Sequence, residues 1–387
     1  MLKERSLSIF AGFAYFVYYI LKIVKKPGVY SGPKLKKFLL NHCRSLKTMY
    51  WPTFWCVGAH LQTVVPTLIQ SPPQHKYRRE KILTKDGGEI SLHWEDNEEA
   101  SKTYNNQVRP TVIILPGLTG CSEAGYVLQM VDSVTSLGYR AVVFNNRGLG
   151  GAELKTPRTY CAANTDDLKL VIEHVHDLYP EATLMAAGAS LGGIILFNYL
   201  AKVGTDTPLV AAFTVSTAWN MFESTKELEK PVNRWTLNYA LALNLRSVLL
   251  RHVSKFKDCL KPSDLEDALK ATSIRQFDAS FTSKVFGYAD VNEYYEDACL
   301  HKKINSIKIP TVCLNAENDP FSPVRALPID ESCTQENVAL IVTSHGGHLG
   351  FLKNIWPRGK SLWHSIFADV VDAAFKHTDE FAFNIPT

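Results

Sequence analysis

The sequence predicts an α/β fold in which a mostly parallel, eight-stranded sheet carries helices on both faces. From residue 79 onward, short apolar runs alternate with amphipathic runs of helical length, a pattern typical of βαβ units. At Ala182–Gly193 an apolar run passes directly into a helical pattern through Gly188-Ala189-Ser190-Leu191-Gly192. The composition, with 46% hydrophobic and 21% charged residues, is that of a globular protein with a sizeable core.

The expected elements follow from these patterns in chain order. A hairpin is predicted where Lys81–Leu83 and Glu89–Trp94 flank Asp86-Gly87-Gly88. Further strands are expected at Thr111–Leu115, Ala141–Phe144, Leu209–Val215, Thr311–Asn315 and Val338–Thr343, and in the apolar run that leads from Ala182 into the Gly188–Gly192 turn. Helices are expected at Tyr126–Leu137, Asp166–Leu178 and Leu362–Phe375, and directly after the Gly188–Gly192 turn, where Ile194, Ile195, Leu196, Tyr199 and Leu200 have helical spacing. The alternation breaks at Trp219–Ser306, which we interpret as a helical cap over the functional site.

The N-terminal segment has the pattern of a membrane anchor. Leu7–Leu21 is a run of 15 uncharged residues, and basic residues flank it on both sides. No small-residue cleavage motif follows it, so the sequence predicts an uncleaved, single-pass transmembrane helix. The basic excess that follows the run would place the body of the protein on the cytosolic side.

The charge is distributed unevenly along the chain. Residues 1–50 hold ten Lys and Arg against one acid, whereas the rest holds 32 Lys and Arg against 37 acids. A mildly acidic body argues against nucleic acid as a partner, and the basic leader favours an anionic membrane surface. The predicted division is an anchor at 1–26, an aromatic and basic juxtamembrane segment at 27–78, and a catalytic domain at 79–380 with the cap insertion at 219–306.

Ser190 is the predicted nucleophile. A Gly-x-Ser-x-Gly sequence between a strand and a helix is typical of a nucleophile elbow, because the strained turn leaves no room for side chains two residues away on either side. The serine needs a histidine base and an acid that orients this base, and in this arrangement they follow the serine in the order acid, then histidine.

Two later loops contain the candidates for these roles. Asp319 and Glu317 follow the Thr311–Asn315 strand, and we favour Asp319 because Pro320 fixes the backbone behind it. His348 and His345 follow the last strand, and we favour His348 because two preceding glycines let the chain turn toward Ser190. The backbone N–H groups of Leu191 and Leu118 are the expected oxyanion donors, the latter in the loop Pro116–Gly120.

The motifs Pro116–Gly120, Gly188–Gly192, Asn318–Pro323 and His345–Phe351 together resemble the α/β-hydrolase superfamily. Asn145–Gly148 and Thr156–Cys161 extend the resemblance to its membrane-anchored, YheT-like branch, from about Tyr50 to the last helix. Within this branch the chain is most similar to phospholipases that act on phosphatidylcholine with A1-type selectivity. The resemblance implies that Ser190, Asp319 and His348 form the triad. It also implies a type II anchor in an endomembrane, which conflicts with the orientation inferred from charge.

The predicted function is therefore a membrane-bound serine hydrolase that cleaves acyl esters of lipids, with a phospholipid as substrate by resemblance. The alternatives are another lipid esterase such as a monoacylglycerol lipase, an acyltransferase in which an alcohol replaces water, and a non-catalytic lipid-binding protein. The complete set of serine, histidine and aspartate argues against the last of these. The chain has no Cys-x-x-Cys pair and no His/Cys metal spacing, and the mechanism requires no metal or organic cofactor.

Overall fold

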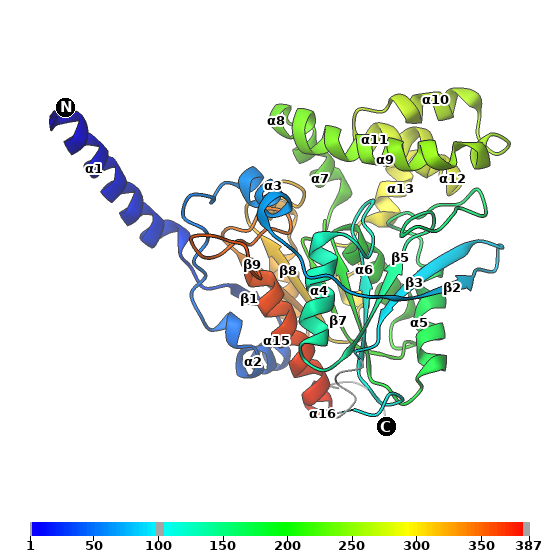
Figure 1. The fold of residues 1–387 in the computed structure, drawn as a ribbon, viewed down its shortest axis with the longest axis horizontal. Coiled ribbons are helices and arrows are strands. Elements are labelled where there is room, and N and C mark those ends of the chain that lie inside the picture. Colours follow the sequence, from blue (N-terminus) through cyan, green and yellow to red (C-terminus); the bar gives the residue numbers. More distant parts are fainter. Residues whose placement is uncertain (1, 98–103, 382–387) are drawn as a thin grey trace.

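A nine-stranded sheet forms the centre of the computed structural model, which describes residues 2–97 and 104–381 (Figure 1). The strand order is β1-β9-β8-β7-β6-β4-β5-β3-β2. The strands are β1 (Gly28–Tyr30), β2 (Arg78–Leu83), β3 (Glu89–Glu95), β4 (Thr111–Leu115), β5 (Arg140–Asn145), β6 (Leu184–Ala189), β7 (Leu209–Val215), β8 (Thr311–Ala316) and β9 (Val338–Thr343).

The prediction of eight mostly parallel strands was wrong, because the sheet has nine strands and is mixed. The six strands from β5 to β9 in sheet order are parallel, whereas β3 pairs antiparallel with β5 and β2 with β3. The ninth strand, β1, pairs antiparallel with the edge strand β9. Its three residues are too few to show the period-two alternation by which a strand is recognised in a sequence.

Helices cover both faces of the sheet, as expected. Alternate residues of β4 enter different cores: Val112 and Ile114 pack under α4 (Gly125–Thr135) and α15 (Leu362–Lys376), whereas Ile113 and Leu115 pack under α5 (Asp166–Leu178) and α6 (Leu191–Val203). Because successive side chains of a strand point to opposite faces, a central strand buried on both sides has an uninterrupted apolar sequence. The short helix α14 (Ile329–Thr334) and the 3-10 turn η8 (Val324–Ala326) connect β8 to β9.

The prediction of a transmembrane anchor and of a single-pass membrane location was also wrong. No helix within residues 2–97 and 104–381 is both long enough and apolar enough to cross a bilayer. The N-terminal helix α1 (Leu2–Tyr18) has 17 residues, and a π-helical turn, η1 (Tyr19–Ile23), follows it. A bilayer span needs about 20 consecutive apolar residues, whereas the first turn of α1 contains Lys3, Glu4 and Arg5. The type II signal anchor that the resemblance implies is wrong for the same reason.

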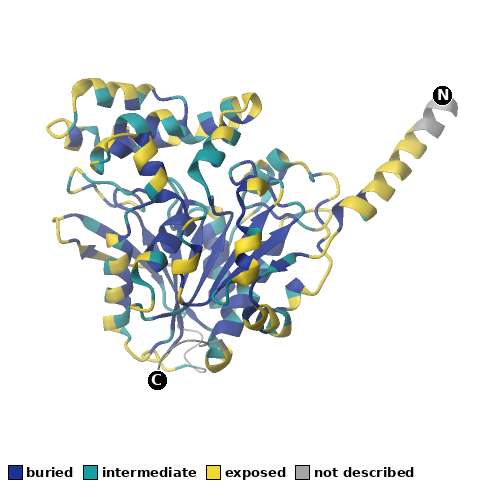
Figure 2. Ribbon diagram, turned by 180° about the vertical axis from the view of Figure 1, so that it is seen from behind, coloured by how far each residue is buried: buried dark blue, intermediate teal, exposed yellow. Residues whose placement is uncertain are grey.

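Helix α1 extends away from the body of the molecule (Figure 1), and its side chains from Ser8 to Tyr18 are exposed (Figure 2). The contact with the body begins at η1, where Tyr19 and Ile23 are buried. The chain then forms β1, α2 (Pro33–His42), the 3-10 turn η2 (Arg44–Leu46) and α3 (Ala59–Ile69). Leu35, Phe38 and Leu39 of α2 are buried in the same core as α15.

A group of helices lies between β7 and β8, above the carboxyl ends of the parallel strands (Figure 1). Its elements are α7 (Met221–Leu228), α8 (Pro231–Asn233), η4 (Arg234–Asn238), α9 (Tyr239–His252), η5 (Val253–Phe256), α10 (Pro262–Lys270), α11 (Ile274–Phe277), η6 (Asp278–Thr282), α12 (Ser283–Val285), α13 (Val291–Ala298) and η7 (Ile304–Ser306). Leu245, Leu249, Phe256 and Phe281 form a separate small core within it.

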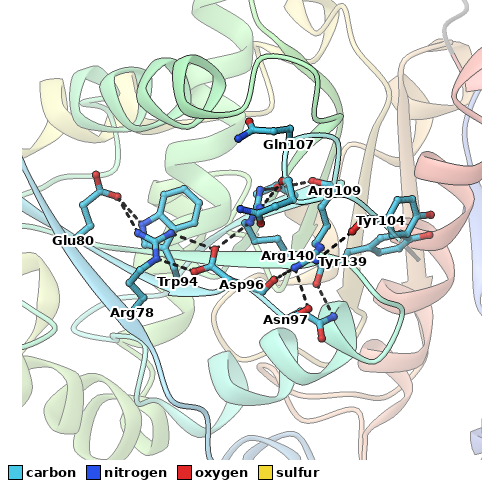
Figure 3. Close-up of polar contacts among 12 residues, drawn as sticks. Arg78, Glu80, Trp94, Asp96, Asn97, Tyr104, Gln107, Arg109, Tyr139 and Arg140 are labelled. Atoms are coloured by element: carbon cyan, nitrogen blue, oxygen red, sulfur yellow. Dashed lines mark hydrogen bonds and ion pairs between the residues drawn. The ribbon is translucent and has the colours of Figure 1, made fainter. Parts of the chain in front are cut away.

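A buried arginine organises the opposite edge of the sheet, where β4 and β5 begin (Figure 3). The side chain of Arg140 is fully buried, and its Nε lies 3.2 Å from Asp96 Oδ1. Asp96 Oδ2 also accepts a hydrogen bond of 2.8 Å from Arg78 Nε. The guanidinium of Arg140 stacks on the ring of Tyr179 at 3.7 Å. Asp96 thus supplies the negative charge that pairs with the buried guanidinium of Arg140.

We predict that Asp96→Ala lowers the free energy of unfolding by about 3 kcal/mol, because it leaves the buried charge of Arg140 without its partner. Arg78→Ala removes the other contact of the same carboxylate, but the Arg78 side chain is 48% exposed. Its loss should therefore cost at most about 1 kcal/mol. Urea unfolding of both variants measures the difference, and equal losses would contradict this account of the cluster.

Candidate active site

Ser190 lies in a strained turn between β6 and α6. Its backbone has φ 52° and ψ −118°, a conformation that costs a non-glycine residue about 1–3 kcal/mol. A Cβ atom at Gly188 would lie 2.5 Å from the carbonyl carbon of Gly192, and one at Gly192 would lie 2.2 Å from the carbonyl oxygen of Leu115. Only glycine fits at either position, so the pentapeptide forces the serine outward at the carboxyl edge of the sheet.

Three loops bring a hydroxyl, an imidazole and a carboxylate together at this edge. His348 Nε2 lies 2.9 Å from Ser190 Oγ. The other ring nitrogen, Nδ1, lies 3.0 Å from Asp319 Oδ2 and 3.1 Å from Asp319 Oδ1. The Asp319 carboxylate is an acceptor, so we assign the ring proton to Nδ1, which leaves Nε2 free to accept from the serine hydroxyl.

Asp319 is held in place by its own loop. Its side chain is fully buried, and its Oδ1 accepts a hydrogen bond of 2.8 Å from the backbone N–H of Phe321. The ring of Phe321 lies with its centroid 4.1 Å from that of His348. The carboxylate therefore meets the imidazole in a fixed orientation, away from water.

The two residues weighed against Asp319 and His348 lie elsewhere. Glu317 is exposed, and His345 Nδ1 lies 3.1 Å from the hydroxyl of the adjacent Ser344. Burial, assisted by the charge of Lys25, lowers the pKa of His345. His348 and Asp319, the two residues favoured from the sequence, are thus the ones that a chain of hydrogen bonds links to Ser190.

Two further residues hold the histidine loop, and no sequence pattern pointed to one of them, Thr63. The hydroxyl of Thr63, on α3, accepts a hydrogen bond of 3.0 Å from the backbone N–H of His348 across 285 residues of sequence. Asn318 Oδ1 accepts one of 2.9 Å from the N–H of Gly347. Contacts between such distant segments leave no local pattern, so only the fold could identify Thr63.

The loop Pro116–Gly120 faces the elbow. The N–H of Gly117 donates to the hydroxyl of Tyr126 at 2.8 Å, and the N–H of Thr119 donates to the hydroxyl of Tyr160 at 3.1 Å. These two bonds fix the loop on either side of Leu118. Within the described part of the chain, the N–H groups of Leu118 and Leu191 donate to no protein atom, so both can bind a ligand oxygen.

A cavity of about 650 Å³ opens above Ser190, His348 and Leu118. Its walls come from α3, from α4 and mainly from the helices between β7 and β8. Most of the lining is apolar, and it includes Leu228, Leu241, Leu245, Leu249, Phe277 and Phe281. The size and the apolar walls are typical of a site for a small, largely hydrophobic ligand.

Asp278 is a buried acid in this mostly apolar wall. Its carboxylate is buried and accepts hydrogen bonds from Thr282 Oγ1 at 2.7 Å and from the Tyr295 hydroxyl at 3.0 Å. Burial raises the pKa of Asp278 to about 6, although these two hydrogen bonds and the charge of Arg275 act in the opposite direction. Desolvation of the charged form is the larger effect.

An elbow at the parallel centre of a mixed sheet with helices on both faces defines a class of enzymes. Residues 110–355 match the alpha/beta hydrolase fold family, and the chain belongs to this family. It is 46% identical to phospholipase ABHD3 of Homo sapiens over 378 residues, which cover 97% of this chain and 92% of that protein. The predicted superfamily and the predicted hydrolase class are therefore confirmed.

Two further relatives place the chain within the family. The putative esterase YheT of Escherichia coli strain K12 is 30% identical over 295 residues, which cover 76% of this chain and 84% of that protein. Monoacylglycerol lipase ABHD2 of Mus musculus is 29% identical over 335 residues, which cover 82% and 78% of the two chains. The YheT-like branch that we inferred from the motifs is confirmed.

We predict that Asp278 makes stability depend on pH. Because its pKa of about 6 lies above the ordinary value near 4, the folded state binds the extra proton between these values. The contribution of this group to stability is complete below pH 4 and is lost as pH rises through 6, by at most about 3 kcal/mol. Asp278→Asn should therefore become more stable relative to wild type between pH 4.5 and 7 in urea unfolding. A difference that stays constant across this interval would contradict the assignment.

Proposed function

We propose that this chain is a serine hydrolase that removes acyl chains from phospholipids, with Ser190 as nucleophile, His348 as general base and acid, and Asp319 as the residue that orients the imidazole. One observation carries the proposal: an unbroken chain of hydrogen bonds from Asp319 through His348 to Ser190, which opens into an apolar cavity. A hydrogen-bonded nucleophile, base and orienting acid are the parts that acyl transfer requires.

The chemistry follows from these positions. Ser190 Oγ attacks the carbonyl carbon of the acyl ester while His348 Nε2 accepts the hydroxyl proton. The buried Asp319 carboxylate, hydrogen-bonded to Nδ1–H, stabilises the imidazolium that forms. The C–O bond to the glycerol backbone then breaks, and His348 returns the proton to the departing alkoxide. A water molecule, activated by the same histidine, finally hydrolyses the acyl-serine.

The negative charge on the carbonyl oxygen develops beside Leu118 and Leu191. Their N–H groups have no other acceptor within the described chain, so they can stabilise this oxygen without breaking an existing bond. Leu191 also begins α6, whose N-terminal dipole favours negative charge at the same place. Each such donor contributes about 2.7–4 kcal/mol to transition-state stabilisation in comparable enzymes.

Two features support a lipid substrate. The cavity walls are apolar side chains over most of their extent, as an acyl chain requires, and the human relative is named a phospholipase. Selectivity for phosphatidylcholine and for the A1 position rests on the motif resemblance. The reaction needs no metal or organic cofactor.

A membrane surface is the proposed source of the lipid. An exposed aromatic surface is formed by Trp51, Phe54, Trp55 and Trp356, and the neighbouring Ile355 is exposed as well. Trp356 is 73% exposed, and its ring lies 6.3 Å from that of Trp55. Tryptophan favours the interface between water and lipid. Next to this surface along the chain, α3 exposes Leu61, Val64 and Leu68, and Val64 also lines the cavity. A lipid could thus pass from the interface along α3 to Ser190.

We predict that Ser190→Ala lowers kcat on phosphatidylcholine at least about 10⁴-fold, because no other group can form the acyl intermediate. The measurement uses a substrate with distinguishable chains at the two glycerol positions, and wild type should release the sn-1 chain. Ser332→Ala, a buried serine of α14 far from the elbow, should keep its activity.

Each other result has a defined meaning. Turnover that survives in Ser190→Ala would contradict the mechanism, and release of the sn-2 chain would contradict A1 selectivity. Hydrolysis of monoacylglycerol in place of phospholipid would overturn the substrate but leave the mechanism intact. Transfer of the acyl group to an added alcohol faster than to water would replace the hydrolase with an acyltransferase.

A second prediction concerns the aromatic surface. The double substitution Trp55→Ser/Trp356→Ser should weaken binding to phosphatidylcholine vesicles in a sedimentation assay and lower the rate on those vesicles by a similar factor, at least about fivefold. The rate on a soluble short-chain ester should stay unchanged, because neither residue lines the cavity. Leu83→Ser, a 74% exposed apolar residue on β2, is the matched control. Unchanged vesicle binding by the double variant would contradict the surface.

A further inference from the structure

A cluster of two histidines and a glutamate lies outside the catalytic site, between the N-terminal and C-terminal parts of the chain. His42 is the last residue of α2, His377 directly follows α15, and Glu380 belongs to α16 (Thr378–Phe381). Helices α2 and α16 are neighbours at the lower edge of the molecule (Figure 1). His42 lies 335 positions before His377 and 338 positions before Glu380, so no local spacing motif predicts the cluster.

The distances within the cluster match those of a metal site. His42 Nε2 lies 3.2 Å from Glu380 Oε2, and His377 Nδ1 lies 3.5 Å from Glu380 Oε1. One ligand atom from each of the three residues lies within 4.8 Å of the other two, and the two imidazole centroids are 3.9 Å apart. Ligands at about 2.0–2.2 Å around a tetrahedral zinc ion are roughly 3.3–3.6 Å from one another. The two histidine–glutamate distances lie in or near this range, and the ligand atoms of the two histidines lie at most 4.8 Å apart.

The ends of two helices make the same place favourable for a cation. Helix α2 ends at His42 and α15 ends at Lys376, so the carboxyl-terminal dipoles of both helices lie at the cluster. Lys376 in the last turn of α15 is paired with Asp372 at 2.9 Å, which offsets its charge. Neutral imidazole and carboxylate are ligands that zinc accepts readily.

Access and orientation also suit a bound ion. The side chains of His42 and His377 are 20% and 38% exposed, and that of Glu380 is 61% exposed, so a fourth position remains open to water. The ring of Phe38, one turn earlier on α2, packs against His42 with centroids 4.7 Å apart and limits its rotation. Partial burial of the histidines means that little ordering remains to be done when an ion binds.

We propose that His42, His377 and Glu380 bind a divalent zinc ion, which fastens the C-terminal helix α16 to α2. Binding replaces the hydrogen bond between His42 and Glu380 and the contact between His377 and Glu380 with three metal–ligand bonds. Each neutral imidazole binds the ion through an unprotonated nitrogen and carries its proton on the other ring nitrogen. The role is structural. It is independent of the hydrolysis at Ser190, which lies at the carboxyl edge of the sheet.

The test is a titration of the full-length protein with Zn²⁺ alone, followed by calorimetry and by thermal unfolding. Wild type should bind one zinc ion that His42→Ala and His377→Ala each weaken at least tenfold. Zinc should raise the unfolding temperature of wild type by several degrees, and chelation should reverse this shift. His174→Ala is the matched control, because His174 also lies 2.8 Å from a glutamate, Glu80, but lacks a second histidine.

X-ray absorption at the zinc edge separates this site from the eight cysteines of the chain. The proposal requires nitrogen and oxygen ligands at about 2.0–2.2 Å, whereas sulfur at about 2.3 Å would overturn it. Zinc binding that is equal in wild type, His42→Ala and His377→Ala would also overturn it. Ester hydrolysis should be the same with and without chelator, so failure of the zinc site and failure of the catalytic proposal give different results.

Discussion

The arrangement of the catalytic edge depends on the absence of side-chain volume at two positions of one turn. Gly188 and Gly192 approach neighbouring backbone so closely that a Cβ atom at either would lie 2.5 Å or less from another backbone atom. Because β6 and α6 meet at this distance, the residue between them must adopt positive φ, and Ser190 does so at 52°. The strain is offset by burial of β6 at the centre of the sheet, and it fixes the hydroxyl against the loops that follow β8 and β9.

The N-terminal quarter of the chain takes part in this arrangement. Strand β1 completes the edge of the sheet beside β9, the strand that leads to the histidine loop. Thr63 of α3 then binds the backbone of His348 itself, and other residues of α3 line the cavity. A close approach of α3 to this loop also explains why Gly350 has no side chain, since a Cβ there would lie 1.9 Å from the carbonyl oxygen of Gln62. The segment before the first hairpin is therefore part of the architecture that holds the candidate active site.

The central elements could be predicted from the sequence because their signals are local. The strands Thr111–Leu115 and Val338–Thr343 have the expected bounds, since a strand buried on both faces is an apolar run with abrupt ends. The turn at Ser190 is also recognisable locally, because Gly188 and Gly192 flank the serine in the sequence. By contrast, β1 is too short for a periodic signal. The helical cap expected at Trp219–Ser306 is divided into many short elements, among them η4, α9 and η5. The apolar run at Leu7–Leu21 has the flanking charges of a membrane span, but its 15 residues fall short of the length of one.

The site could be predicted only where motif and chain order coincide. Asp319 and His348 follow the strands that the order requires, but the choice against Glu317 and His345 depended on which side chain the fold turns inward, and this is a tertiary property. Thr63 and Tyr126 act through contacts across distant segments, and such contacts leave no pattern in the sequence.

The central claim is that one serine, Ser190, is the nucleophile and that one particular histidine, His348, activates it. Mass-spectrometric mapping of the residue labelled by a fluorophosphonate tests it most directly. The account predicts a single adduct on Ser190 that forms at least about 100-fold more slowly in His348→Ala and at an unchanged rate in His345→Ala. An adduct on another residue, or labelling that depends on His345 in place of His348, would contradict it.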